Sequence, residues 1–212
     1  MRSENHACVS QKIVILGTGG TIAGLSLIPG AGGAYRAAQV GIEDLLKQSA
    51  ALPPKASTKP ANASEAVTEM SLTLVSEQLA QVDSKDMDLA VWQHLLQRCR
   101  YWLGQPGVAG LVITHGTDTL EETAWFLQQV LASDKPVVLT CAMRPATALA
   151  ADGPQNLRDA LAVARAPEAR GVLVVCAGRI HSARAVQKVH PYRLDAFSSG
   201  DAGPCGWVEQ GQ

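Results

Sequence analysis

The stretch Val108-Ala-Gly-Leu-Val-Ile-Thr-His-Gly-Thr-Asp-Thr-Leu-Glu-Glu-Thr123 carries the clearest structural signal in the chain. Residues 108–113 form an apolar, β-branched run of the length expected for a buried strand. A polar loop with a central glycine follows at 114–119, and residues 120–131 then repeat apolar side chains at helical spacing. Strand, polar loop and helix in this order place functional groups at the carboxyl edge of a parallel sheet.

The polar residues of this loop have two interpretations. Thr117, Asp118 and Thr119 are residue types that cap helices, and Glu121 and Glu122 lie in the first turn, where the helix dipole favours negative charge. In the first interpretation these residues only start the helix, with Thr119 as the cap. In the second, Thr117 and Asp118 carry chemistry. Composition alone favours the first interpretation, but a second loop of the same character near the N-terminus favours the second.

The rest of the chain alternates apolar strands with amphipathic helices. We expect strands at 12–16, 67–75, 108–113, 136–141 and 171–176, a short strand at 183–189, and helices at 40–50, 89–103, 120–131 and 156–165. This alternation predicts a doubly wound α/β domain, with a mostly parallel sheet and flanking helices. We place the domain at 12–203, after an N-terminal tail at 1–11 and before the start of a hairpin at 204–212.

The loop after the first predicted strand is rich in glycine. Gly17-Thr-Gly-Gly-Thr-Ile-Ala-Gly24 resembles a dinucleotide fingerprint, but Ile22 stands where that motif needs Gly or Ala, and no phosphate-loop lysine follows. The turn instead presents two hydroxyls, Thr18 and Thr21. Residues 25–38, around Tyr35, form either a lid or a surface insertion, and residues 52–66 are a surface connector.

Composition excludes several function classes. Net charge is −1 and 17% of residues are charged, so nothing favours a nucleic acid partner or a membrane surface. No stretch has the length of a membrane span. The five cysteines are scattered without metal-ligand spacing, and Cys141 and Cys176 are expected to be small core residues. We therefore expect a cytoplasmic protein without a metal site.

Several polar residues follow predicted strands directly and should meet at one sheet edge: Thr21, Ser84, Thr117, Asp118 and the loop 142–153. Ser84 or Asp86 is also a candidate cap for the next helix. Two hydroxyls, a carboxylate and Lys188 suit acyl transfer, because a hydroxyl attacks a carbonyl well only when a base takes its proton. Amides of the glycine-rich turn could hold the oxyanion. His115 lacks a ligand partner at metal spacing, so we interpret it as a structural residue behind the site.

Five segments together resemble bacterial-type L-asparaginases. Residues 17–24 and 112–123 look like the two signature motifs of that family, and 83–87 (Asp-Ser-Lys-Asp-Met) looks like its substrate-binding turn. Residues 142–145 and 151–157 resemble the segments that follow in the family. The resemblance runs in order from about Lys12 to the last residues. It implies hydrolysis of L-asparagine to L-aspartate and ammonia, with no cofactor.

By motif position, the resemblance makes Thr21 the nucleophile and Tyr35 its helper in proton transfer. Thr117, Asp118 and Lys188 would form the second catalytic group, which activates either a nucleophile or the water of deacylation. A covalent acyl-enzyme and direct attack by water both remain open. The same positions imply that Ser84 holds the substrate carboxylate and Asp118 the α-ammonium. The substrate-binding residues implied in full are Gly20, Ser84, Lys85, Gly116, Thr117 and Asp118.

The sequence departs from the family in two ways. Lys85 stands where we expect Gln or Ser, which adds a cation near the substrate carboxylate. We also expect the second, smaller domain of the family to be missing from this chain, which leaves three explanations: a short asparaginase, a truncated product or an isolated domain. We expect a homo-oligomer, either a dimer or a tetramer. Alternative functions are a glutaminase, an ammonia-supplying amidotransferase subunit, and an inactive amino-acid-binding domain; a nucleotide-binding protein is the least favoured.

Overall fold

The computed structural model describes residues 11–27, 35–50 and 72–208. Within these residues a seven-stranded sheet has the order β11-β8-β7-β6-β5-β1-β4. Its strands are β1 (Gln11–Gly19), β4 (Leu72–Val82), β5 (Val108–Thr114), β6 (Val137–Thr140), β7 (Val172–Cys176), β8 (Arg179–Ser182) and β11 (Gly206–Trp207). Strands β4, β1, β5, β6 and β7 pair in parallel, whereas β8 and β11 are antiparallel additions at one end. The predicted fold class is confirmed.

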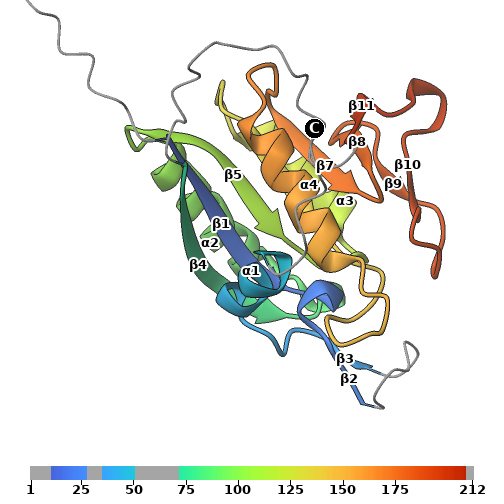
Figure 1. Cartoon of the computed structure of the whole chain (residues 1–212). Coiled ribbons are helices and arrows are strands. Elements are labelled where there is room, and N and C mark those ends of the chain that lie inside the picture. Colours follow the sequence, from blue (N-terminus) through green and yellow to red (C-terminus); the bar gives the residue numbers. More distant parts are fainter. Residues whose placement is uncertain (1–10, 28–34, 51–71, 209–212) are drawn as a thin grey trace, which may run out of the picture.

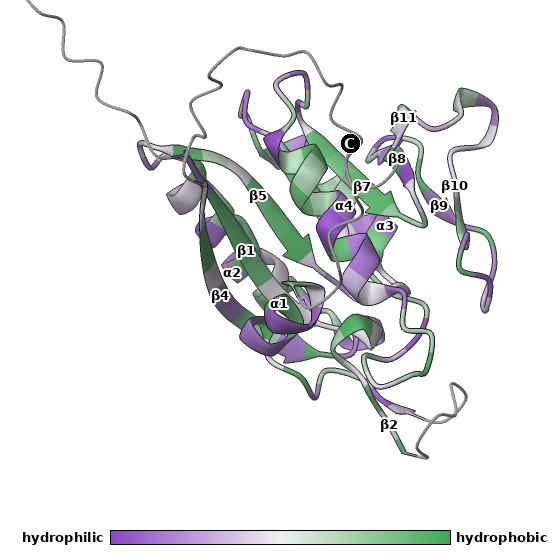
Figure 2. Cartoon of the chain, in the orientation of Figure 1, coloured by the Kyte–Doolittle hydropathy of each residue, from purple (hydrophilic) through white to green (hydrophobic). Residues whose placement is uncertain are grey.

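Helices cover both faces of the sheet (Figure 1). Helices α2 (Leu89–Leu103) and α3 (Leu120–Val130) lie on one face, and α1 (Ile42–Ala50) and α4 (Gly153–Arg165) lie on the other. Figure 2 shows the central strands as the most hydrophobic part of the chain, with polar residues on the outer sides of the helices. The apolar stripes of the helices therefore face the sheet.

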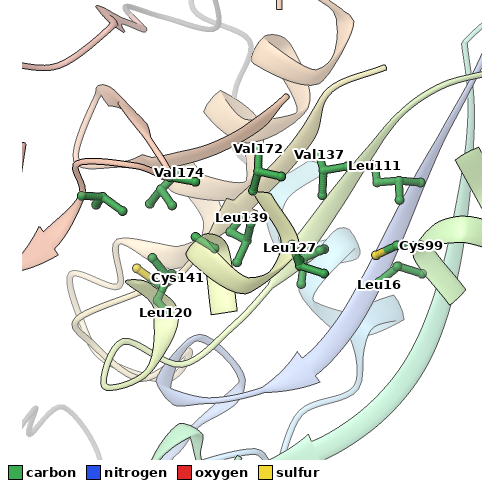
Figure 3. Packing of buried hydrophobic residues seen from close by; sticks show 14 of the residues in the cluster. Leu16, Cys99, Leu111, Leu120, Leu127, Val137, Leu139, Cys141, Val172 and Val174 are labelled. Atoms are coloured by element: carbon green, nitrogen blue, oxygen red, sulfur yellow. The ribbon is translucent and has the colours of Figure 1, made fainter. Parts of the chain in front are cut away.

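Strand β5 shows why its sequence is an unbroken apolar run. Leu111 and Ile113 lie in the core layer with α2 and α3, whereas Val112 lies in the layer with α1 and α4. All three are fully buried. Figure 3 shows the first layer, where Leu111 lies beside Val137 and Leu127 lies near Leu139. A strand that is covered on both faces needs apolar side chains at every position.

Most predicted elements are present, with shifted ends. The strand expected at 67–75 extends to residue 82, with residues 67–71 outside the described ones. Helix α4 begins three residues earlier than predicted because Pro154 fits its first turn. The short strand expected at 183–189 is β9 (Gln187–Lys188), which pairs with β10 (Phe197–Ser198). Strand β8 was not predicted. In the segment 25–38, β2 (Leu25–Ser26) pairs with β3 (Tyr35–Arg36).

Some predictions fall outside the described residues, namely the connector at 52–66, most of the tail at 1–11 and the centre of the 25–38 loop. The predicted cap of the second long helix was wrong. Asp88, rather than Ser84 or Asp86, accepts a hydrogen bond from the backbone amide of Val91 at 2.8 Å. In the described part of the chain, no helix is long and apolar enough to cross a membrane.

A buried asparagine joins the carboxyl ends of β6 and β7. The Asn156 side-chain amide donates to the carbonyl oxygen of Cys141 at 2.9 Å, and its oxygen accepts from the backbone amide of Ala177 at 3.0 Å. Ala177 has a φ of 48°, a strained value for a residue other than glycine. Asn156 is 3% exposed, so both bonds form away from water. The two strand ends are therefore fixed to helix α4 and to each other.

The substitution Asn156→Ala should lower the free energy of unfolding by roughly 2–4 kcal/mol, because it leaves two buried backbone groups without partners. Denaturant unfolding followed by circular dichroism measures this loss. Gln155→Ala, at the exposed neighbouring position on the same helix, is the control and should change stability by less than about 1 kcal/mol. Equal losses for the two variants would contradict this account of the strand ends.

Candidate active site

Three loops meet at the carboxyl edge of the sheet through close backbone contact. A Cβ atom on Gly20 would lie 2.2 Å from the Cα of Gly116, and a Cβ on Gly116 would lie 2.5 Å from the Ser84 hydroxyl oxygen. Gly20 also has a φ of 78°, which L side chains rarely adopt. The loops after β1, β4 and β5 therefore touch only because glycine occupies these positions. Thr21, Thr117 and Ser84 are brought together by this contact.

The first threonine is paired with a tyrosine. Thr21 Oγ1 and Tyr35 Oη lie 2.7 Å apart in hydrogen-bond contact. Thr21 lies at the start of a 3-10 turn (Thr21–Ala23) and is 7% exposed, whereas Tyr35 on β3 is 37% exposed. The other hydroxyl of the turn, that of Thr18, points into the protein. Thr18 Oγ1 donates to the carbonyl oxygen of Thr114 at 2.9 Å and is buried, so its role is structural.

The second threonine is paired with a lysine and an aspartate. Lys188 Nζ donates to Thr117 Oγ1 at 2.8 Å and to Asp118 Oδ1 at 2.6 Å. The Lys188 side chain is 19% exposed and that of Asp118 is 54% exposed. The backbone amide of Lys188 donates to the Glu121 carboxylate in the first turn of α3. Glu121 therefore fastens β9 to the helix that follows the Thr117 loop, which sequence reasoning missed.

The turn that carries Ser84 is fastened to the same loop. Ser84 Oγ accepts from the backbone amide of Asp118 at 3.1 Å, and the Ser84 carbonyl accepts from Thr119 Oγ1 at 2.8 Å. The predicted capping bond of Thr119 is thus wrong: the residue occupies the N-cap position of α3 without a side-chain cap. Lys85 Nζ forms an exposed ion pair with Asp86 at 2.5 Å.

The loop 142–153 reaches the glycine-rich turn, as its place after β6 predicts. The amide of Ala146 donates to the carbonyl of Gly24 at 2.9 Å, and Thr147 Oγ1 accepts from the amide of Ser26 at 2.8 Å. Asp152 holds the start of the loop by accepting from the amides of Met143 and Arg144. This loop is a neighbour of the candidate site.

His115 lies behind the site, as predicted. Its Nδ1 is 2.7 Å from the carbonyl oxygen of Gly116, which can only accept, so Nδ1 carries the proton. Nε2 then accepts from Thr123 Oγ1 at 3.0 Å, and Thr123 accepts from the indole of Trp92 at 2.9 Å. Complete burial lowers the pKa of His115 to about 4. The neutral imidazole therefore supports the Gly116 backbone. Among the described residues, no group of three or more His, Cys, Asp or Glu is placed to hold a metal ion.

A doubly wound α/β sheet that presents two threonine hydroxyls at its carboxyl edge, each hydrogen-bonded to a titratable side chain, is compatible with a site for acyl transfer. Comparison with known proteins identifies the family. Residues 12–212 match the family model described as "Asparaginase, N-terminal". The chain belongs to the asparaginase family.

Individual relatives agree with this assignment. L-asparaginase 2 of Bacillus subtilis is 42% identical, and the match covers 93% of this chain and 49% of that protein. Glutaminase-asparaginase of Pseudomonas fluorescens biotype A is 40% identical, with 95% and 51% covered. The solved structure of a probable cytoplasmic L-asparaginase from Campylobacter jejuni has a TM-score of 0.82 and 41% identity, and the match covers 95% of this chain and 57% of that one. The chain spans about half the length of the curated relatives it matches.

The substitution Gly20→Ala should destabilise the protein and disrupt the site together. The positive φ alone costs roughly 1–3 kcal/mol, and the overlap with Gly116 adds to this cost. Thermal unfolding measures the loss. Gly41→Ala is the matched control, because its added Cβ would approach nothing closer than 4.0 Å and the protein should keep its stability. If Gly20→Ala and Gly41→Ala have the same unfolding temperature, the arrangement of the loops does not depend on the contact between Gly20 and Gly116.

His115 should make stability depend on pH. Its pKa in the folded protein is about 4, below the ordinary value of 6.5, so the unfolded chain binds the proton first as pH falls. Stability should therefore decrease from pH 6.5 towards pH 4, by about 2 kcal/mol between pH 7 and pH 5. Unfolding of wild-type protein and His115→Gln at both pH values measures this difference. The exposed control His94→Gln should retain the wild-type dependence, and an unchanged dependence in His115→Gln would contradict the assignment.

Proposed function

We propose that this chain carries the catalytic groups of an L-asparaginase, which hydrolyses L-asparagine to L-aspartate and ammonia without a cofactor. One observation carries the proposal: two nearly buried threonine hydroxyls lie at one sheet edge, and each has its own proton-transfer partner. A hydroxyl needs such a partner to attack an amide. Membership of the asparaginase family supports the same substrate class.

In the proposed first step, Thr21 Oγ1 attacks the side-chain amide carbon of the substrate. Tyr35, in hydrogen-bond contact with this oxygen, receives the proton as the C–O bond forms. The proton then passes to the leaving nitrogen as the C–N bond breaks, which releases ammonia and leaves an ester on Thr21. Backbone amides of the loops at Gly20 and Gly116 would stabilise the negative charge on the carbonyl oxygen.

In the proposed second step, Thr117 and Lys188 activate a water molecule that hydrolyses the ester. Lys188, which is paired with the Asp118 carboxylate at 2.6 Å, donates to Thr117 Oγ1 and orients this hydroxyl. Thr117 Oγ1 takes a proton from the attacking water and passes its own proton to the Thr21 oxygen as the ester C–O bond breaks. If water attacks the substrate amide directly instead, Thr117, Lys188 and Asp118 activate that water molecule and no ester forms on Thr21.

The neighbouring polar groups suit an amino acid substrate. The Asp118 carboxylate is more than half exposed and could receive the α-ammonium group, while the Ser84 hydroxyl lies beside it. Lys85 adds a cation on the same turn. We assign the substrate carboxylate to Ser84 and Lys85, and we include Gly20, Gly116 and Thr117 in the substrate-binding set.

The assembly is part of the proposal. Three large apolar side chains of the segment 189–207 are exposed and would be covered in an assembly: Val189, Tyr192 and Trp207. We propose a homo-oligomer, a dimer or a tetramer, as the active form. A cytoplasmic location is proposed from the description of the Campylobacter relative.

The variants Thr21→Ala and Thr117→Ala should each lower kcat for L-asparagine by about 100-fold or more at unchanged circular dichroism, because each removes a hydroxyl from a proton-transfer pair. Thr21→Ser and Thr117→Ser restore a hydroxyl and should recover part of the rate. Ammonia release from protein of known oligomeric state is the measurement. Mass spectrometry of protein quenched with acid during turnover would show the aspartyl ester as a mass increase of the peptide that contains Thr21. Its presence would favour the covalent route over direct attack by water.

The same assay separates the alternatives. A relative described as a glutaminase-asparaginase gives a reason to compare L-glutamine with L-asparagine side by side. Faster turnover of glutamine would reassign the substrate to the longer amide. Calorimetric binding of L-aspartate without ammonia release would instead favour an inactive amino-acid-binding domain. Wild-type turnover in both Thr→Ala variants would refute the proposed site.

A further inference from the structure

Two buried cysteines lie side by side where β6 and β7 end. Thr140 on β6 is in register with Val175 on β7, so the next residues, Cys141 and Cys176, are neighbours on the same face of the sheet. Both belong to the core layer under α3, where Figure 3 shows Cys141 beside Leu120 and Leu139. Registered neighbours on adjacent strands have Cα atoms about 4.8 Å apart. This falls within the roughly 4.4–6.8 Å that a disulfide spans.

The positions of the two cysteines are fixed by the Asn156 side chain. It donates to the carbonyl oxygen of Cys141 and accepts from the amide of Ala177, the residue after Cys176. On the opposite face, Thr140 Oγ1 donates to the carbonyl oxygen of Val175 at 2.8 Å. The hydrogen bonds of Asn156 and Thr140 therefore fix the separation of the two strand ends that carry the thiols.

A histidine completes this cluster. His181 on β8 is in register with Val174, which places its ring on the face that carries Cys176. Its Nδ1 lies 2.8 Å from Ser199 Oγ, and its Nε2 is a buried nitrogen with no hydrogen-bond partner among the residues described. His181 is 1% exposed. A buried ring nitrogen without a hydrogen-bond partner lowers the stability of the folded protein unless a nearby polar group interacts with it.

The two thiols differ in acidity. The hydrogen bond from the Cys141 thiol, with a smaller contribution from His181, lowers the pKa of Cys176 to about 6 against the opposing effect of burial. The same hydrogen bond and burial raise the pKa of Cys141 well above its ordinary value. Cys99, which is buried in the same layer, has its pKa raised to about 12 by burial. Cys176 is thus the more acidic thiol of the pair, whereas burial alone acts on the isolated Cys99.

We propose that Cys141 and Cys176 form a dithiol that a hydroperoxide closes to a disulfide, with Cys176 as the sulfur that is oxidised first. None of the groups in the proposed amide hydrolysis takes part in this chemistry. The proposal therefore stands or falls separately from the proposed function.

Two steps balance the reaction. The Cys176 thiolate attacks the terminal peroxide oxygen; an S–O bond forms and the O–O bond breaks. The leaving alkoxide takes a proton to become an alcohol, or, with hydrogen peroxide, the leaving hydroxide takes a proton to become water. The product is a sulfenic acid on Cys176. Cys141 sulfur, as it loses its proton, then attacks Cys176 sulfur; the S–S bond forms, the S–O bond breaks, and water leaves. In total, two thiols are oxidised by two electrons and one peroxide is reduced.

The test treats the folded wild-type protein with hydrogen peroxide, alkylates the remaining thiols after denaturation, and identifies disulfide-linked peptides by mass spectrometry. We expect a link between Cys141 and Cys176 that dithiothreitol reverses, with Cys99 recovered as an alkylated thiol. Because both cysteines are at most 3% exposed, we expect the reaction to be slower than oxidation of the exposed Cys205.

Variants identify the order of the steps. Cys141→Ala removes the resolving thiol, so a dione reagent specific for sulfenic acids should label Cys176. Cys176→Ala should prevent both the link and this label, and Cys205→Ala is the matched control that should leave the link unchanged. Recovery of Cys141 and Cys176 as free thiols in wild-type protein, after Cys205 has been fully oxidised, would overturn the proposal without any variant.

Discussion

The close approach of Gly20 to Gly116 is the constraint on which the rest of the site depends. Thr21 and Thr117 each follow one of these glycines directly, so the distance between the two backbones also sets the distance between the two threonines. A side chain at either glycine would separate the loops. Gly20 also has a positive φ, which only glycine adopts without an energetic cost. The Ser84 turn rests on the same contact and is therefore positioned by it.

A line of hydrogen-bonded side chains behind this contact keeps the Gly116 loop in place. The chain of hydrogen bonds from Trp92 through Thr123 to His115 ends on the carbonyl of Gly116. Because burial keeps His115 neutral near pH 7, this support adds no charge next to Lys188 and Asp118. The charged groups are instead at the outer side of the site, where Asp118 is half exposed and water can screen it.

The sequence predicted the sheet and the convergence of Thr21, Ser84 and Thr117, because buried parallel strands have apolar runs and their carboxyl ends share an edge. The roles of single hydroxyls were less accessible. Thr119 looks like a cap in local sequence, yet its partner is the Ser84 carbonyl, which is 35 residues away. Thr18 likewise bonds across to Thr114. Such long-range partners cannot be recognised from the periodicity of the sequence. The same holds for the hydrogen bond between the Lys188 amide on the two-residue strand β9 and the Glu121 carboxylate.

The cysteine pair and the candidate site are connected through a single residue. Thr140 accepts a hydrogen bond from the amide of His115 at 2.9 Å and donates to Val175, and Cys141 is the next residue along the chain. A change in the separation of β6 and β7 would therefore act on the backbone that holds Gly116. Interiors this densely packed transmit small displacements instead of absorbing them. The two sulfurs of the proposed dithiol thus lie one residue away from a hydrogen bond that positions the loop carrying Thr117 and Asp118.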